Sequence, residues 1–227
     1  SNVCSFWSML DTLVTLNCIE ITIGRPRVGN FMRGFVDVFA RIARERFAEI
    51  CGDILSENGL KIFLMDIEKS HLDHVMAHGE YVNKELACNA EIVATTDRDE
   101  AIKDADFVIC ALEKDRNVYW SQDFHIPRKY GFDQVYGENG GVGSLFHALR
   151  NIKVIMDLAR KMEQLCPNAL LLNFSNPEHK ICEAVTRLTS IKAVGLCHGV
   201  FMGREQLSKL LEVPLTDLQT KACGINH

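Results

Sequence analysis

A cysteine and two histidines near the end of the chain have the types and spacing that a metal site requires. Cys197 is followed directly by His198, and His227 lies about 30 residues later. A thiolate and an imidazole presented from neighbouring strand ends could bind a divalent metal ion. Adjacent residues of an extended strand point to opposite faces, so we do not expect Cys197 and His198 to ligate the same ion. A buried cysteine is often only a small apolar side chain, and that interpretation stays open.

Carboxylates and amides at three other places could bind a nucleotide and a sugar. Asp66 ends an apolar run, a position where dinucleotide-binding folds place an acid that accepts the ribose hydroxyls of NAD. Glu138 lies in a glycine-rich segment before a long helix, whose first N–H groups attract an anion or an oxygen-rich sugar. Asn173 and Asn176 end another apolar run, where doubly wound folds bind ligands. Each place also has a purely structural interpretation, as a helix cap or a tight turn, and that interpretation stays open.

Short apolar runs alternate with helical patterns from residue 60 onward, which predicts an α/β fold with a Rossmann-like, doubly wound parallel sheet. Most of the runs lack polar alternation, as expected for strands buried on both faces. The segment at 113–142 is predicted to be a long binding loop. Strands are expected at 61–65, 91–95, 107–112, 169–174, 193–197 and 217–224, and helices at 69–87, 97–104, 143–164, 177–188 and 203–212.

The helix at 143–164 has the clearest periodicity in the chain. Ser144 can cap it, and Pro167 stops it. Apolar residues at spacings of three and four predict one buried stripe. The members of this stripe are Leu145, Leu149, Ile152, Ile155 or Met156, Ala159 and Met162.

The composition is that of an ordinary globular protein and excludes several classes of function. The 227 residues are 47% hydrophobic and 24% charged, and 25 basic residues against 30 acidic ones give a net charge of −5. Without a basic stripe, we expect neither nucleic acid nor a membrane as a partner. The nine cysteines are widely spread and never form a C-x-x-C pair, which predicts reduced thiols and a cytoplasmic location.

The glycine-rich turn that normally precedes the ribose-binding acid is not recognisable. Residues 24–29 read Gly-Arg-Pro-Arg-Val-Gly, and the proline removes an N–H that pyrophosphate needs. The turn normally lies about 20 residues before the acid, yet residues 40–46 contain no glycine. We therefore divide the chain into an atypical N-terminal segment at 1–43, an NAD-binding domain at 44–198 and the start of a truncated catalytic domain at 199–227.

Taken together, these segments resemble glycoside hydrolase family 4, the NAD- and manganese-dependent glycosidases whose fold is related to that of lactate and malate dehydrogenases. The resemblance covers about residues 60–227, in the right order and at plausible spacings. The segments that carry it are 64–67, 105–109, 126–131, 138–150, 173–177, 194–198 and 224–227.

The resemblance implies an oxidation–elimination–addition–reduction mechanism, in which NAD takes hydride from C3 of the sugar and later returns it. A metal polarises the C2 and C3 oxygens while the aglycone leaves. Asp66 and Asn173 would then hold NAD, and Glu138 and Asn176 would contact substrate. Cys197 and His227 would ligate Mn²⁺ or another divalent metal. His198, our candidate catalytic residue, stands where phospho-α-glucosidases carry an aspartate acid catalyst.

A histidine at this position resembles the subgroups that act on unphosphorylated hexosides or hexuronides. The predicted substrate is therefore a small sugar glycoside, and we also expect a homo-oligomer. Two alternatives stay open: an NAD-dependent 2-hydroxy-acid dehydrogenase, and an inactive nucleotide-binding fragment, which the missing glycine turn favours.

Overall fold

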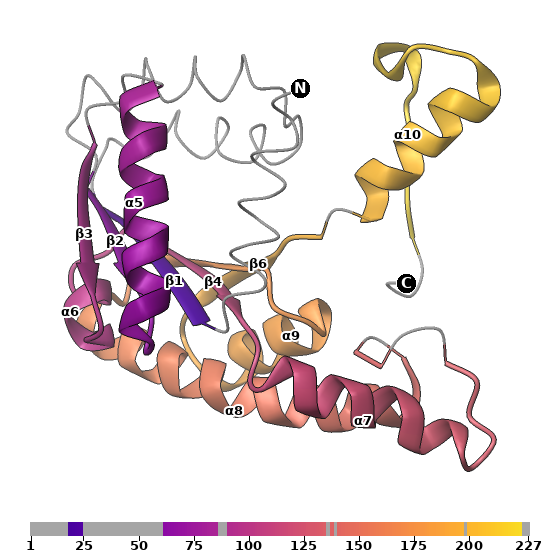
Figure 1. Ribbon diagram of the computed structural model, residues 1–227, viewed down its shortest axis with the longest axis horizontal. Coiled ribbons are helices and arrows are strands. Elements are labelled where there is room, and N and C mark those ends of the chain that lie inside the picture. Colours follow the sequence, from indigo (N-terminus) through magenta and orange to yellow (C-terminus); the bar gives the residue numbers. More distant parts are fainter. Residues whose placement is uncertain are drawn as a thin grey trace.

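The computed structural model describes residues 18–24, 61–85, 90–134, 137–138, 140–197 and 199–223. In these residues, strands join into one sheet in the order β3-β2-β1-β4-β5-β6, with helices packed on it (Figure 1). The strands are β1 (Cys18–Gly24), β2 (Lys61–Met65), β3 (Glu91–Thr95), β4 (Phe107–Leu112), β5 (Leu170–Asn173) and β6 (Lys192–Gly195). The helices are α5 (Lys69–Glu85), α6 (Arg98–Ile102), α7 (Arg116–Arg128), α8 (Gly141–Leu165), α9 (Glu178–Leu188), α10 (Gly199–Leu211) and the 3₁₀ turn η2 (Leu215–Asp217).

The strand order is that of a doubly wound dinucleotide-binding sheet, which confirms the predicted α/β class. β2 and β3 pair in parallel, as do β4, β5 and β6. The central strand β1 departs from the all-parallel expectation, because it runs antiparallel to both β2 and β4. An antiparallel strand completes the hydrogen-bonding ladders of its neighbours equally well, so the sheet stays continuous.

The direction of β1 decides where the following segment leaves the sheet. Gly24 pairs with Lys61 at the amino end of β2, whereas Glu20 pairs with Met65 near its carboxyl end. The arginine- and proline-containing turn that begins at Gly24 therefore starts at the edge opposite to Asp66. Residues 25–29 of this turn lie outside the described residues, so its predicted relation to pyrophosphate stays a prediction.

Two apolar cores hold the helices against the sheet. The larger core joins β4 and β5 to α6, α8 and α9, and its fully buried members include Val108, Ile155 and Leu171. The smaller core packs α5 on β2 through Leu64 and Leu72. Burial on this scale anchors the carboxyl ends of the strands, where the polar residues follow.

The predicted strand bounds at 61–65, 91–95 and 107–112 are confirmed. The predicted loop at 113–142 is wrong in part, because α7 occupies its first half. This helix buries Asp123 and Pro127 rather than an apolar stripe, so its sequence lacks the usual periodicity. The strand expected at 217–224 is also wrong over the described residues, where η2 and an irregular segment replace it.

The start of α8 differs from its predicted cap and buried stripe. Gly140 is the N-cap, and Ser144 lies inside the first turn. Leu145 and Leu149 are more than half exposed, whereas His147 and Asn151 are buried. The first half of this helix therefore turns a polar face inward, and the predicted stripe is correct only from residue 152 onward.

Two further expectations concern the cysteines and the membrane. Cys110, Cys166, Cys182, Cys197 and Cys223 form no disulfide, in agreement with reduced thiols. Burial raises the pKa of Cys166 and of Cys182 to about 11. Among the helices that the structure describes, none is both long and apolar enough to cross a bilayer.

Candidate functional site

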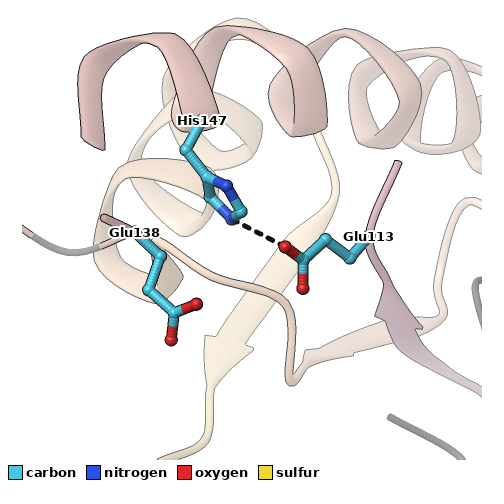
Figure 2. A group of neighbouring side chains, drawn as sticks. All are labelled: Glu113, Glu138 and His147. Carbon is cyan, nitrogen blue, oxygen red and sulfur yellow. Dashed lines mark ion pairs between the residues drawn. The ribbon is translucent and has the colours of Figure 1, made fainter. Parts of the chain in front are cut away.

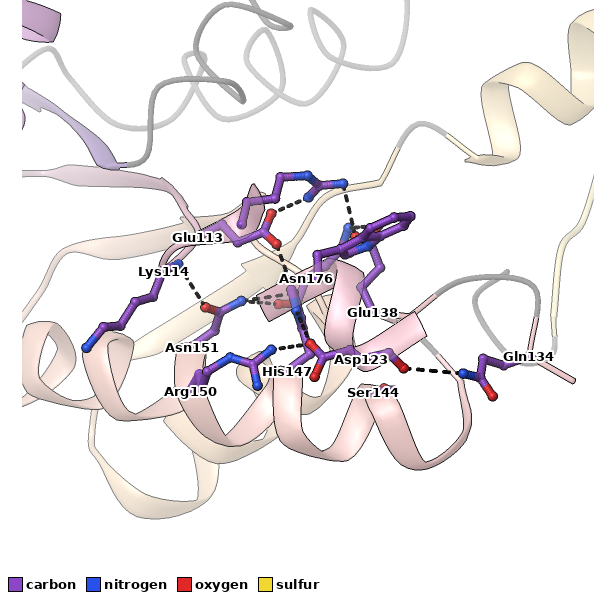
Figure 3. Close-up of polar contacts among 12 residues, drawn as sticks. Glu113, Lys114, Asp123, Gln134, Glu138, Ser144, His147, Arg150, Asn151 and Asn176 are labelled. Carbon is purple, nitrogen blue, oxygen red and sulfur yellow. Dashed lines mark hydrogen bonds and ion pairs between the residues drawn. The ribbon is translucent and has the colours of Figure 1, made fainter. Parts of the chain in front are cut away.

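Polar side chains from five segments of the chain meet beyond the carboxyl ends of β4 and β5 (Figure 3). They follow β4, line α7, come from the turn at 137–138, line the first half of α8, and follow β5. We call this group the polar cluster. Its members are Glu113, Arg116, Trp120, Asp123, Glu138, His147, Arg150, Asn151 and Asn176.

Two residues singled out from the sequence, Glu138 and Asn176, contact each other in this cluster. The Asn176 side-chain amide donates to Glu138 Oε1 at 3.1 Å. The backbone carbonyl of Asn176 accepts from Asn151 Nδ2 at 2.8 Å, which fixes the loop after β5 against α8. Glu138 is only 7% exposed, while Asn176 is half-buried. An amide and a carboxylate side by side offer both donor and acceptor to the hydroxyls of a sugar.

Arg116 links two carboxylates on the exposed side of the cluster. Its guanidinium bonds Glu113 and lies 3.2 Å from Glu138 Oε2, which also accepts from Trp120 Nε1 at 2.8 Å. The guanidinium lies 5.6 Å from the centre of the Trp120 ring. Burial raises the pKa of Glu113, and the bound Arg116 offsets part of this rise. The result is a charged acceptor surface beside a half-buried aromatic ring.

His147 is the most deeply buried titratable group of the cluster. Burial lowers the pKa of its imidazole, although the carboxylates of Glu138 and Asp123 act in the opposite direction. Asn151 Nδ2 lies 3.1 Å from Nε2, and Asp123 Oδ2 lies 3.4 Å from Nδ1. An amide nitrogen can only donate, so Nε2 is the acceptor and the proton sits on Nδ1, facing Asp123.

One buried acceptor in the cluster has no hydrogen-bond partner among the described residues. Glu113 Oε1 lies 3.6 Å from His147 Nε2 (Figure 2). This nitrogen already accepts from Asn151. Glu113, Glu138 and His147 hold ligand atoms within 4.8 Å of one another, a set that could bind a divalent cation. Arg116 supplies the positive charge between the two carboxylates in the structure.

Asn173, predicted to bind the cofactor, is fully buried at the end of β5. Its side-chain amide donates to the carbonyl of Ser175 at 3.0 Å, and its side-chain oxygen accepts from the Ser175 N–H at 3.1 Å. Ser175 Oγ accepts from the backbone N–H of Leu112, next to Glu113. Asn173 therefore shapes the loop that carries Asn176, and its contact with a cofactor stays a prediction.

Asp66 lies at the same edge of the sheet, because β2 and β4 are both antiparallel to β1. The carboxyl group is 1% exposed, its Oδ1 accepts from the N–H of Glu68, and its Oδ2 has no hydrogen bond among the described residues. Burial raises its pKa, and the bond from Glu68 offsets part of the rise. The β2–β3 hollow, a space of about 500 Å³, lies beside it. Its walls are Met65, Ile67, Thr96, Asp97, Arg98 and Asp99.

Of the predicted metal and acid residues, the structure describes one. Cys197 follows β6 and is half-buried, and its Sγ accepts from the N–H of Gly199 at 3.4 Å. His198 and His227 lie outside the described residues, so their predicted roles stay predictions. In the part of the chain that the structure describes, the metal-capable group of Glu113, Glu138 and His147 does not include Cys197.

Sequence reasoning missed most of the polar cluster. Glu113, Arg116 and Asp123 fell in the predicted loop, and His147 and Asn151 were not among the residues predicted to be buried on the helix at 143–164. The available signal was the spacing of 147, 150 and 151 on one helical face. This part of the helix has an apolar face with residues 145 and 149 and a polar face opposite to it, and either face could turn inward. Apolar periodicity alone favoured burial of the apolar face.

Comparison with known proteins identifies the family of this chain. The model of the family described as "Family 4 glycosyl hydrolase" matches residues 46–213. An alpha-glucosidase of Erwinia rhapontici is 42% identical over 138 residues, which are 60% of this chain and 30% of the relative. A 6-phospho-beta-glucosidase of Escherichia coli is 34% identical over 172 residues, which are 74% of this chain and 38% of the relative.

A solved structure shares the fold. The 6-phospho-alpha-glucosidase from gut microorganisms, in complex with NAD and Mn²⁺, has a TM-score of 0.59 at 26% identity, over 70% of this chain and 37% of that one. The chain thus spans about a third of the length of these relatives. Because the family model covers well over half of its residues, the chain belongs to the family 4 glycosyl hydrolases.

Proposed function

We propose that the protein is a glycosidase that hydrolyses O-glycosidic bonds of hexosides or hexuronides with the help of NAD and a divalent metal. The observation that carries this proposal is the contact between Asn176 and Glu138 in a polar cluster at the carboxyl edge of a family 4 sheet. The matching family model is that of glycosyl hydrolases, so we prefer this function to a 2-hydroxy-acid dehydrogenase. The inactive-fragment alternative is decided by the assay below.

The residues at the β2–β3 edge fit NAD. Asp66 Oδ2 is a buried acceptor without a hydrogen bond among the described residues, and the adjacent hollow has room for a nucleoside. A ribose hydroxyl would satisfy this oxygen, and the negative charge of Asp66 disfavours a 2′-phosphate. When bound, NAD supplies reversible oxidation of a sugar hydroxyl, so the overall reaction has no net redox change.

Cys197 fits a divalent metal in its chemistry and position. It forms no disulfide, is half-buried, and follows β6, whose residue Gly195 pairs with Asn173 at the carboxyl edge. We propose that Cys197 and His227 hold the metal, which polarises two neighbouring sugar oxygens when bound. Mn²⁺ accepts such a donor set when sugar or water oxygens complete it.

The chain's own residues position the sugar. Asn176 can donate to a substrate oxygen through the amide hydrogen not used by Glu138, and Glu138 can accept from a sugar hydroxyl. Arg116 and Trp120 hold the Glu138 carboxylate in place, so its orientation does not depend on the substrate. We propose His198, beside the metal cysteine, as the group that moves a proton to the leaving oxygen. A homo-oligomer and a cytoplasmic location also stay predictions.

The direct test is hydrolysis of a panel of nitrophenyl hexosides and hexuronides by the full-length protein, with NAD and Mn²⁺ each omitted in turn. We expect activity to require both, and deuterium from heavy water to appear at C2 of the released sugar. Activity that is indifferent to both omissions would contradict the proposal.

A matched pair of variants ties the activity to the site. Asn176→Ala should reduce kcat/KM about 100-fold, because it removes a donor that contacts substrate. Asn168→Ala, an exposed asparagine in the turn before β5, should leave kcat/KM unchanged. Equal losses in the two variants would show that the amide of Asn176 has no role in substrate binding.

A further inference from the structure

The fixed charges of the polar cluster carry one more negative than positive charge. The carboxylates belong to Glu113, Asp123 and Glu138, and the guanidinium groups to Arg116 and Arg150. His147 does not restore the balance, because its deep burial disfavours the imidazolium. A ligand that enters the cluster therefore meets a net negative site.

Both guanidinium groups are already bound to carboxylates. Arg116 bonds Glu113 and Glu138, and Arg150 bonds Asp123. All three carboxylates are at least 89% buried. An anionic group on the substrate would have to share an arginine with one of these carboxylates, using the N–H groups that remain, and this sharing would leave the buried carboxylate less fully neutralised.

Lys180 on α9 is a further cation close to the first turn of α8. Its ammonium group donates to Ser144 Oγ at 2.6 Å. The charges that act most strongly on the Glu113 carboxyl are those of Arg116, Glu138 and Arg150, and Lys180 is instead bonded to Ser144. Lys180 therefore does not compensate the excess negative charge beside Glu113.

The surroundings of Glu113 Oε1 indicate which kind of substrate group this oxygen can bind. It is a buried acceptor that faces a second acceptor, His147 Nε2, at 3.6 Å. Two acceptors in this arrangement need a donor, and a buried acceptor without one is costly. A sugar hydroxyl supplies a donor, whereas a phosphate or a carboxylate at neutral pH adds further acceptors.

We propose that Glu113 makes the site selective for an uncharged hexoside, by accepting a hydrogen bond from one sugar hydroxyl and by repelling a substrate that carries a phosphate or a carboxylate. This inference rests on the proposed glycosidase function and deepens it. Glu113 becomes a specificity-determining residue in a family whose members named above act on both uncharged and 6-phosphorylated glucosides.

The test uses the full-length protein loaded with NAD and Mn²⁺. The substrates are nitrophenyl glucosides and galactosides of both anomers, their 6-phosphates and the corresponding uronides. We expect kcat/KM for an uncharged hexoside to exceed that for its 6-phosphate and its uronide about 100-fold. Comparable or higher values for either charged series would overturn the proposal.

Glu113→Gln separates charge from size at this position. The variant should lower the preference for uncharged substrate about 10-fold, mainly by raising KM for the uncharged hexoside. Glu80→Gln, an exposed carboxylate on α5, should leave the preference unchanged. If Glu113→Gln has the same ratio of kcat/KM for uncharged over charged substrate as the wild-type protein, Glu113 does not determine specificity and the proposal fails. Loss of Mn²⁺ binding in Glu113→Gln, seen in the spin-resonance signal of the ion, also overturns it, because Glu113 would then be a metal ligand.

Ligand binding separates this inference from the proposed function. In saturation-transfer NMR with the loaded wild-type protein, we expect methyl hexosides to bind and hexose 6-phosphates and hexuronates not to bind. This measurement needs no turnover and no folded variant. If no glycoside is hydrolysed but this binding order holds, the glycosidase proposal fails and the selectivity of the site stands. Preferred binding of a charged sugar, or binding of none of them, overturns the inference.

Discussion

The polar cluster and the β2–β3 hollow lie at the same edge of one sheet, yet they differ in how their buried carboxylates are satisfied. In the cluster, Glu138 is bonded to Arg116, Trp120 and Asn176. At the hollow, Asp66 Oδ2 has no hydrogen bond among the described residues. Apart from Glu113, whose Oε1 also lacks a hydrogen bond among the described residues, residues of the cluster therefore contribute to the stability of the fold, whereas Asp66 costs stability until a ligand satisfies it. Removing a residue should affect folding in the first region and ligand binding in the second.

The largest effect is expected where α7 and α8 touch at the floor of the cluster. A Cβ added at Gly143 would lie 2.1 Å from the backbone oxygen of Asp123, which cannot move without α7. Gly143→Ala should lower the free energy of unfolding by about 3 kcal/mol, measured by urea denaturation. Gly203→Ala on α10 has nothing within 4 Å of its Cβ and should be neutral or stabilising. If both substitutions changed the free energy of unfolding by the same amount, the close contact of α7 with α8 would have no special role in stability.

Asp66→Asn should weaken ligand binding without lowering the stability of the fold. It removes the negative charge and turns one of the two carboxylate acceptors for the ribose into an NH₂ donor, so NAD affinity should fall about 10-fold in a fluorescence titration of the reduced cofactor. Because the variant replaces a buried carboxylate that has one unsatisfied oxygen, the free energy of unfolding should not fall. Asp73→Asn, an exposed site on α5, should change neither quantity. A destabilised Asp66→Asn protein with normal NAD binding would mean that Asp66 is a structural cap only.

The pH dependence of stability should distinguish His147 from the carboxyl groups. The pKa of His147 is lowered on folding, so as the pH falls below about 6.5 the unfolded chain takes up a proton before the folded one does. The neutral imidazole thus makes its full contribution to stability above that pH. The contribution is lost progressively as the pH falls from there to the lowered pKa of His147 in the folded protein. Between pH 7 and 5.5, the wild-type protein should lose about 1 kcal/mol more than His147→Gln.

The carboxyl groups of Glu113 and Asp66 act with the opposite sign. Their pKa values are raised on folding, so their cost to stability is largest at neutral pH and disappears as the pH falls below the ordinary carboxyl range. The difference between wild-type protein and His147→Gln isolates the imidazole from these groups. A steeper loss in the variant would contradict the neutral form assigned to His147.

The smallest effect is expected for Trp120→Phe. The variant loses the bond from Nε1 to Glu138 but keeps an aromatic ring beside Arg116 and Phe124. We expect the free energy of unfolding to fall by about 1 kcal/mol or less, with KM for the sugar rising a few-fold. Tyr130→Phe, at a highly exposed position, serves as the control for thermal denaturation. A larger loss would mean that the indole N–H orders more of the cluster than Glu138 alone.

The same contrast explains what could be predicted from the sequence. Asp66, Glu138 and Asn176 were found because each stands beside a local signal: the end of an apolar strand, a run of glycines, or a proline. Glu113, Asp123 and His147 have no such signal, because their burial depends on contacts that form only in the folded protein: Glu113 with Arg116, Asp123 with Arg150, and His147 with Asp123. The exposed Leu145 and Leu149 show the same limit, since periodicity identifies an apolar face but not the direction in which the protein turns it.

The close approach of α8 to α7 at Gly143 has a consequence for recognition. With helix backbone directly against helix backbone, the wall that carries Asp123 and His147 cannot adapt its shape to an incoming molecule. The entropy of ordering these side chains is lost when the protein folds, not when it meets its sugar. The affinity for a sugar at this wall should therefore depend mainly on how well the shape of the sugar matches the wall. It should depend little on any movement of α7 and α8 toward the sugar.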